Sequence, residues 1–502
     1  MRASGILMPI FSLPSRYGIG TLGKKAYDFV DFLQAAGQSY WQILPIGPTS
    51  YGDSPYQSFS SFAGNPYFID IEMLIDDGFL TQDEADSAFF GSNPCRVDYG
   101  ALYENRLALL SKAFARFVPD SEYYDFCRNN GCWLREYSLF MVIKEQNGGV
   151  AWLEWDAPLR SHDKHALELV AEKYSEEIEF YNFVQFMFWK QWYALKSYAN
   201  ERGIRIIGDI PIYVALDSAD VWSEREQFLL LPDGHPSAVA GCPPDAFSKD
   251  GQLWGNPLYN WERMKSDRYA WWKRRMGFSL GTYDLVRIDH FRGFDSFYSI
   301  PSGDKTARGG CWKKGPGMDL FSALFADFGD NMPIIAEDLG FLTPSVRRLL
   351  ADTDFPGMKV LQFAFDTREE SDYLPHNYTR NCVVYTGTHD NDTIMGWTAS
   401  APSSDVAAAK KYMHVAPDEG FNWAMIRTAM MSVADTAIFM MPDFLGLGSQ
   451  ARINTPSTLG GNWNWRIEDG CINYWLAGII REQTALYGRL PNREPEKEIY
   501  ET

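Results

Sequence analysis

The chain has 502 residues, of which 46% are hydrophobic, so it can form several domains or one large α/β barrel with insertions. With 46 Lys and Arg residues against 65 Asp and Glu residues, its formal net charge of -19 argues against nucleic acids and anionic membrane surfaces as partners. No apolar segment reaches the ~18 residues that a membrane span requires.

Short apolar segments rich in β-branched residues recur along the chain, and a longer polar or helix-patterned stretch follows each of them. This alternation is typical of βα units, in which parallel strands alternate with helices. Eight units would close a TIM barrel, although an open doubly wound sheet can show similar segments. The predicted strands are residues 5–11, 40–46, 204–212, 285–289, 333–338, 358–365, 382–385 and 436–441.

Acidic residues at the ends of several predicted strands favour the barrel, because the carboxyl ends of barrel strands converge on one face, where the active site lies. We therefore predict an α/β fold, a (β/α)8 TIM barrel with inserted subdomains in its long strand-to-helix loops. Residues 1–502 are expected to form a single catalytic domain, since the sequence shows no internal repeat and no flexible linker.

Two intervals are too long to be simple connections between a strand and the next helix. Residues 48–203 begin with a loop rich in Tyr, Ser and Gly and then show helical periodicity, as at 101–117 and 178–200. Residues 214–283 show no regular pattern. We predict a mainly helical insertion at about 48–203 and an irregular loop insertion at about 214–283, both of which could form lids or binding walls.

Carboxyl groups follow two predicted strands in a pattern that suits retaining glycosyl transfer, which needs a carboxylate nucleophile and a carboxylic acid that protonates the leaving oxygen. Asp289 ends one strand, and Arg287 lies two residues earlier on the same strand face, where it can keep the aspartate ionised. Glu337 follows a wholly apolar strand, and a dry setting would raise its pKa as a general acid requires. Its neighbour Asp338 should point to the opposite face.

A third cluster, His389, Asp390 and Asp392, follows the strand at 382–385 and suits hydrogen bonds to sugar hydroxyls. Asp209, at the end of another strand, is expected to order the surrounding loops. A single Asp at a strand end usually caps a helix, so no one of these positions is decisive. Acidic groups at three strand ends, interrupted only by the strand at 358–365, together indicate a catalytic centre.

The remaining composition points to a sugar-binding protein of a reducing compartment. Aromatic residues make up 15% of the chain, and their flat faces stack on sugar rings, although most of them are expected to pack the core. The seven cysteines contain no CxxC pair, which predicts neither a disulfide framework nor a zinc site. The N-terminal residues lack the features of a signal peptide, so we expect a cytoplasmic location.

Long segments from about residue 5 to 490 resemble bacterial 4-α-glucanotransferases of the amylomaltase type, a branch of the α-amylase clan. The segments that carry the resemblance are SLPSRYGIGTLG, YWQILPIGPTSYGDSPYQSFSSFAGNPYFID, GDIPIYVALDSADVW, PPDAFSKDGQLWGNPLYNW, VRIDHFRGF, AEDLG, THDNDT and LGLGSQARINTPSTLGGNWNW. The resemblance implies a TIM barrel that cuts α-1,4-glucans and passes the released chain to the 4-hydroxyl of another sugar.

Position by position, the resemblance implies that Asp289 is the nucleophile, Glu337 the acid/base and Asp390 a third carboxylate that grips sugar hydroxyls beside the scissile bond. It also implies substrate contacts from Arg287 and His389. A retaining mechanism then places the carboxyl groups of Asp289 and Glu337 about 5–5.5 Å apart.

Further binding residues follow from the same resemblance. Tyr56 corresponds to a ring that stacks on sugar at the donor side, and Trp254 to a platform at the acceptor side. Asn462 is expected to hydrogen-bond substrate, and Asp209 completes the substrate-binding set. Phe247 belongs to the loop over the acceptor groove, where many relatives carry two adjacent aromatics and this chain has Ala246 before it; a weaker grip on the acceptor is expected.

The expected partners are malto-oligosaccharides and α-1,4-glucans, with glucose as an acceptor, and the reaction needs neither cofactor nor metal. Two alternatives remain open. An α-1,4-glucan hydrolase could use the same barrel and carboxylates, because the motifs fix the first half-reaction better than the fate of the intermediate. A non-catalytic glycan-binding protein is a more remote alternative. The oligomeric state does not follow from the sequence.

Overall fold

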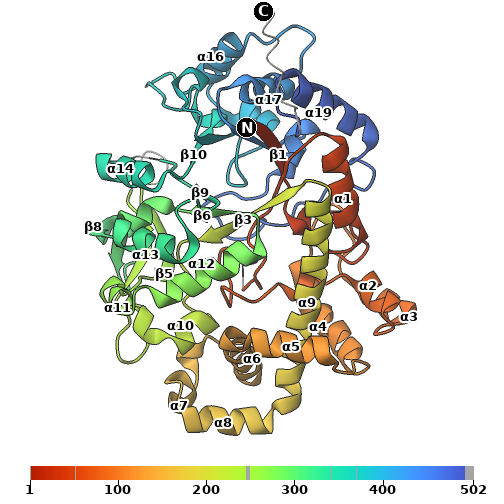
Figure 1. Ribbon diagram of the computed structural model, residues 1–502, viewed down its shortest axis with the longest axis vertical. Helices are drawn as coiled ribbons and strands as arrows, with labels where there is room; N and C mark the ends of the chain where they lie inside the picture. Colours follow the sequence, from red (N-terminus) through yellow and green to blue (C-terminus); the bar gives the residue numbers. More distant parts are fainter. Residues whose placement is uncertain (1, 51, 245–248, 341, 369, 492–502) are drawn as a thin grey trace, which may run out of the picture.

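Eight parallel strands form the centre of the computed structural model, which describes residues 2–50, 52–244, 249–340, 342–368 and 370–491. They are hydrogen-bonded in the order β10-β11-β12-β1-β2-β3-β6-β9. The backbone amide of Ala336 donates to the carbonyl of Pro356 at 3.0 Å, so the two end strands meet and the sheet closes into a barrel (Figure 1). The strands span Ala3–Leu7 (β1), Tyr40–Gln42 (β2), Arg205–Pro211 (β3), Leu285–Asp289 (β6), Ile334–Ala336 (β9), Gly357–Val360 (β10), Cys382–Tyr385 (β11) and Thr436–Met440 (β12).

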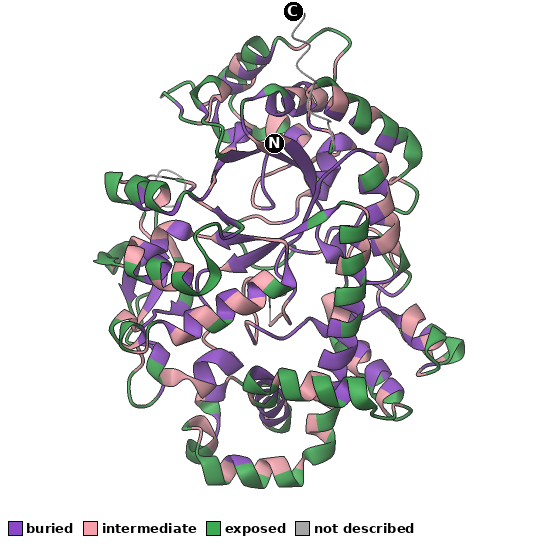
Figure 2. Cartoon of the chain, viewed as in Figure 1, coloured by how far each residue is buried: buried purple, intermediate pink, exposed green. Residues whose placement is uncertain are grey.

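The predicted (β/α)8 barrel is confirmed, and each barrel strand overlaps a predicted one. The barrel strands are almost entirely buried, as the parallel strands of a closed barrel must be (Figure 2). At Gly5 a Cβ atom would lie 2.4 Å from the Cβ of Tyr40 on β2, so only glycine allows these strands to pair. Strands β2 and β9 are shorter than predicted because the chain leaves the ladder after Gln42 and Ala336 and enters the loops at the carboxyl ends.

Helices surround the barrel with their outer faces exposed (Figures 1 and 2). The connection from β10 to β11 is the exception, because its described residues form only the short 3-10 helices η7 (Leu361–Phe363) and η8 (Pro375–Asn377). The helices that follow or precede the other barrel strands are Lys24–Ala35 (α1), Ser175–Glu201 (α9), Ala270–Thr282 (α12), Met318–Phe328 (α13), Pro344–Thr353 (α14), Ile394–Ser400 (α15), Ser403–Met413 (α16), Phe421–Met431 (α17), Met441–Phe444 (α18) and Tyr474–Leu486 (α19).

The long interval after β2 is mainly helical and lies below the barrel in Figure 1. The helical segments predicted at 101–117 and 178–200 correspond to α4 and α9. The division of the chain into one domain with two insertions stays a prediction. Besides α9, this interval contains Ile71–Asp76 (α2), Gln82–Asp86 (α3), Tyr99–Phe114 (α4), Ser121–Asn129 (α5), Gly131–Gln146 (α6), Ala157–Arg160 (α7) and Lys164–Lys173 (α8).

Helix α9 joins this helical region to the barrel and fixes the loop that follows β2. The side chain of Gln185 accepts a hydrogen bond from the backbone amide of Gly64 at 2.7 Å and donates one to its carbonyl at 2.9 Å. Gln191, on the same helix, makes the corresponding pair with Asp70 at 2.7 and 3.3 Å. Both glutamines are buried, so these bonds anchor the loop from inside the protein.

The interval 214–283 is more regular than the sequence predicts. It contains Ala219–Ser223 (α10), Ala238–Cys242 (β4), Gln252–Pro257 (β5), Trp261–Ser266 (α11) and α12. Strands β4 and β5 join Ser296–Pro301 (β7) and Cys311–Lys314 (β8) in an antiparallel sheet of order β5-β4-β7-β8. The partners of β4 therefore include a strand beyond Asp289, a long-range pairing that local patterns do not reveal.

Among the residues that the structure describes, no helix combines the length and apolar character needed to cross a bilayer. None of the cysteines forms a disulfide bond in that part of the chain.

Candidate active site

Arg287 organises the carboxyl ends of β3 and β6. It lies opposite Asp209 in the register of these strands and donates to both oxygens of that carboxylate, at 2.7 and 2.6 Å. Its second terminal nitrogen donates to Oδ1 of Asp289 at 2.9 Å. The side chains of Arg287 and Asp209 are 3% and 0% exposed, whereas that of Asp289 is 31% exposed. The arginine thus links the buried carboxylate of Asp209 to the partly exposed carboxylate of Asp289.

Glu337 lies beside Asp289 and is held by two backbone amides. The amide of His290 donates to Oε2 at 2.7 Å, and the amide of Leu339 donates to Oε1 at 2.9 Å. Burial, followed by the charge of Asp289, raises the pKa of Glu337 to about 8. Burial also raises the pKa of Asp289 from its ordinary value, while Arg287 opposes that shift. At neutral pH Glu337 therefore holds its proton, while Arg287 favours the ionised form of Asp289 against the effect of burial. Their predicted separation of about 5–5.5 Å stays a prediction.

Asp390 lies in the loop after β11, and residues that the sequence analysis did not single out hold it in place. The side-chain amide of Asn454 donates to Oδ1 of Asp390 at 2.6 Å, and Arg452 donates to its backbone carbonyl at 2.9 Å. The side chain of Asp390 is 45% exposed, and Nε2 of His389 lies 3.5 Å from its Oδ1. Asn454 and Arg452 lie in SQARINTPST, part of a segment that carries the family resemblance. That resemblance could have pointed to both residues.

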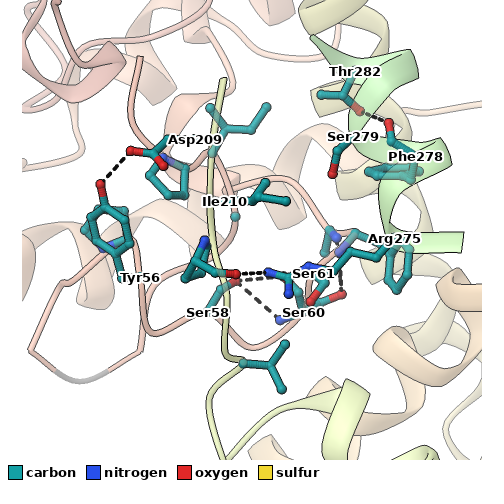
Figure 3. A pocket seen from close by; sticks show the side chains of 18 of the residues that line it. Tyr56, Ser58, Ser60, Ser61, Asp209, Ile210, Arg275, Phe278, Ser279 and Thr282 are labelled. Atoms are coloured by element: carbon teal, nitrogen blue, oxygen red, sulfur yellow. Dashed lines mark hydrogen bonds between the residues drawn. The ribbon is translucent and has the colours of Figure 1, made fainter. Parts of the chain in front are cut away.

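Tyr56, in the loop after β2, contacts Asp209 on β3 and His389 in the loop after β11. Its hydroxyl donates to Oδ2 of Asp209 at 2.8 Å, as Figure 3 shows, and lies 2.9 Å from Nε2 of His389. The rings of Tyr56 and His389 also pack against Trp463, with centroids 5.7 and 5.9 Å away. Tyr56 and Asp209 line a cavity of about 60 Å³ together with Ser58. These contacts fix the Tyr56 ring beside the carboxylates.

Trp254 on β5 packs against His290, the residue that follows Asp289. The two rings meet edge to face with centroids 4.8 Å apart, and Trp254 is half-buried. His290 has a positive φ of 54°, a conformation that turns the chain sharply after Asp289. Burial, followed by the charge of Arg292, lowers the pKa of His290 to about 3, so the ring is neutral. Within the described residues its buried Nε2 has no hydrogen-bond partner.

Two of the expected site residues, Asp209 and Asn462, make their hydrogen bonds within the protein. Asp209 is fully buried and holds other side chains. Asn462 makes its hydrogen bonds within its own loop, accepting from the amide of Thr455 and donating to Thr458. Phe247 lies outside the described residues. Among those residues no group of three or more His, Cys, Asp or Glu side chains could hold a metal ion.

The fold and the site together define the class of protein. A (β/α)8 barrel that presents an arginine-bound aspartate and a protonated glutamic acid at the carboxyl ends of its strands has the arrangement of the enzymes that cleave or transfer glycosidic bonds through two carboxyl groups. The sequence profile of the 4-alpha-glucanotransferase family matches residues 8–472. The chain belongs to the 4-alpha-glucanotransferase family.

Individual relatives agree with this assignment. The 4-alpha-glucanotransferase of Clostridium butyricum is 47% identical over 96% of this chain and 100% of the relative, and that of Thermus thermophilus is 45% identical over 93% and 95%. The structure of amylomaltase from Streptococcus agalactiae in complex with acarbose is 43% identical, covers 98% of this chain and 100% of that one, and has a TM-score of 0.95. The family and the reaction class that the motifs predict are thereby confirmed.

Proposed function

We propose that Asp289 is the nucleophile and Glu337 the acid/base of a retaining transfer of α-1,4-glucan segments. The observation that carries this assignment is the difference between the two neighbouring carboxyl groups. Arg287 donates directly to Asp289, whereas Glu337 is buried beside that charge and has a pKa of about 8. At neutral pH Asp289 is therefore suited to attack as a nucleophile, and Glu337 is suited to donate a proton.

In the first half-reaction Asp289 attacks the anomeric carbon of the donor glucan, and the carboxyl proton of Glu337 goes to the departing glycosidic oxygen. The products are a β-linked glycosyl ester on Asp289 and a shortened glucan. Esterification removes the negative charge of Asp289, which is one of the two causes of the raised pKa of Glu337. Its carboxylate form is then better tolerated, as the second half-reaction requires.

In the second half-reaction the 4-hydroxyl of the acceptor attacks the anomeric carbon, and Glu337 takes the hydroxyl proton. The bond to Asp289 breaks, and the two inversions restore the α linkage. Asp390 and His389 are proposed to hold hydroxyl groups of the sugar at the scissile bond. The exposure of Asp390 and its fixed orientation by Asn454 support this role.

The donor and acceptor sides are proposed to lie at the two ends of this site. Tyr56 would stack on donor sugar and Trp254 on acceptor sugar, and Asn462 and Phe247 complete the proposed binding set. Asp209 acts through Arg287 and Tyr56 and is a positioning residue in this proposal. The substrates would be malto-oligosaccharides and longer α-1,4-glucans, with glucose as an acceptor. A cytoplasmic location is also proposed, because the seven cysteines are free thiols, as is usual in reducing compartments.

The test is incubation of the purified protein with maltotriose alone, with and without a chelator, followed by chromatography of the products. Chains longer than the trimer together with free glucose would support transfer. Glucose and maltose with nothing longer would replace the transferase by an α-1,4-glucan hydrolase. The variant Asp289→Ala should lose turnover and keep the fold, and unchanged activity in it would refute the assignment of the nucleophile. Equal rates with the chelator are expected.

A further inference from the structure

Two consecutive residues at the start of α19 carry aromatic side chains that are highly exposed. Tyr474 is 76% exposed and Trp475 is 77% exposed. The next most exposed tryptophan, Trp312, is 42% exposed, and most of the others are buried. Exposing a large apolar ring to water costs free energy. A surface that exposes several such rings therefore marks a binding site for a ligand or a partner.

Tyr474 also lines a groove of about 210 Å³ between α1 and the segment that leads into α19. Helices α1 and α19 lie side by side at one edge of the barrel (Figure 1). The groove carries both polar and apolar groups, and none of its lining residues belongs to the catalytic set. Its other lining residues include Lys25, Asp28, Phe29, Asp31, Asp469 and Asn473.

The charges in the groove are compensated locally. Lys25 lies 2.6 Å from Asp469, and Asp31 accepts hydrogen bonds from Tyr198 and from Arg202, the latter at 2.8 Å. A charged ligand would gain little attraction from groups already paired in this way. An uncharged ligand with many hydroxyl groups could bond to the carboxylate and amide oxygens at the rim and place its apolar face on an aromatic ring.

We propose that Tyr474, Trp475 and the adjoining groove form a second binding site for α-glucan chains, separate from the catalytic cleft. This inference rests on the proposed function, which makes a long neutral glucan the substrate. A chain held at the edge of the barrel would stay near the catalytic cleft between successive transfers, because a second attachment raises the local concentration of its free ends. The site would matter for polymers and not for short oligosaccharides.

A second copy of the chain is the competing occupant of this surface. The two exposed rings, at about 150–250 Å² each, would bury far less than the ~800 Å² per partner that a stable interface buries. The net charge of -19 also opposes self-association. The small area and the paired charges favour a glucan.

The experiment uses the full chain with Asp289→Ala, which cannot consume the polymer, and measures retardation by glycogen in native gels. Adding Tyr474→Ala and Trp475→Ala together should weaken glycogen binding about tenfold, as expected for loss of two aromatic contacts. The matched control is Tyr124→Ala, which removes a tyrosine that is 58% exposed on α5, away from the groove. It should bind glycogen like its parent.

The same substitutions in the otherwise unchanged chain should lower the ratio of activity on long amylose to activity on maltotriose. Binding and ratio equal to those of the parent would overturn the second site while leaving maltotriose transfer, and hence the proposed function, intact. Absence of maltotriose transfer in the parent would refute the proposed function instead. A change from dimer to monomer in light scattering would assign the surface to self-association and also overturn the proposal.

Discussion

Arg287 and Asp209 form a doubly hydrogen-bonded ion pair inside the barrel, directly across the ladder between β6 and β3, with N···O distances of 2.7 and 2.6 Å. Both side chains are buried, and the free nitrogen of the guanidinium points to Asp289. The pair therefore orients the nitrogen that donates to Asp289. We expect Asp209 to affect catalysis through Arg287, although its own side chain is fully buried.

Replacing Asp209 by Ala should destabilise the protein by about 3–5 kcal/mol, because it leaves the buried guanidinium of Arg287 with one carboxylate in place of two. Activity should fall as well, since Tyr56 loses a hydrogen-bond partner in the same step. Urea unfolding at pH 7 measures the first effect and maltotriose transfer the second. The matched control is Asp31→Ala, a half-exposed carboxylate paired with Arg202, which should cost about 1 kcal/mol or less. Equal losses in both variants would contradict the special role of the buried pair.

The pKa of Glu337 predicts the alkaline side of the pH profile. Because its pKa is raised to about 8, the carboxyl stays protonated at neutral pH, and kcat/KM for maltotriose should fall as the pH rises through about 8. The variant Glu337→Gln should lose about 10²–10⁴-fold in rate with maltotriose.

A maltosyl fluoride donor separates this role from a structural one, because fluoride leaves without a proton. Formation of the glycosyl-enzyme from that donor should survive in Glu337→Gln to a much larger extent. A profile that stays flat from pH 6 to 10 in the parent, or equal losses with both donors, would remove Glu337 as the acid.

The barrel could be predicted from the sequence because each of its strands is a short apolar segment buried by its own neighbours. The local hydrophobic pattern does not predict the antiparallel sheet β5-β4-β7-β8 beside the barrel. Strands β4 and β5 each contain Gly, β5 ends in Pro257, and β4 pairs with β7, which lies beyond β6 in the chain.

The candidate catalytic carboxyl groups could be named from the sequence because strand ends mark them and the motifs resemble those of a known family. No strand end marks the residues that support them, although Asn454 lies in a segment that carries the resemblance. Asn454 reaches Asp390 across 64 residues of chain, and His290 presents its backbone amide to Glu337 across 47. Such contacts arise when loops from different strands converge, so composition and spacing carry no trace of them.

Asn454 should prove to be a positioning residue for Asp390. In Asn454→Ala the carboxylate loses the 2.6 Å hydrogen bond that fixes it, and kcat/KM for maltotriose should fall about 10–100-fold, the effect of a misplaced group near the reacting bond. Asn462→Ala is the informative comparison, because the hydrogen bonds of its side chain to described residues all lie within its own loop. A larger loss in Asn462→Ala than in Asn454→Ala would mean that a substrate contact of Asn462 outweighs the hydrogen bond of Asn454 to Asp390.

The raised pKa of Asp443, a residue outside the proposed active site, predicts how the free energy of unfolding depends on pH. Its carboxylate is fully buried and accepts hydrogen bonds from the hydroxyl of Thr386 and the amide of Ile394, both at 2.8 Å. Burial raises its pKa to about 7, above the ~3.9 of an unfolded Asp. The folded chain thus holds a proton that the unfolded chain releases between these values, so the free energy of unfolding should fall by up to ~4 kcal/mol as the pH rises from 4 through 7.

The variant Asp443→Asn removes this titration and keeps the contacts, because its oxygen can accept from Ile394 and its amide can donate to Thr386, whose hydroxyl reverses its role. The decrease in urea midpoint between pH 5 and pH 8.5 should therefore be smaller in the variant than in the parent. Other buried carboxyl groups of raised pKa, such as Asp220, will leave part of the decrease in both proteins. An identical decrease in the two would mean that Asp443 titrates in the folded chain as it does in the unfolded one.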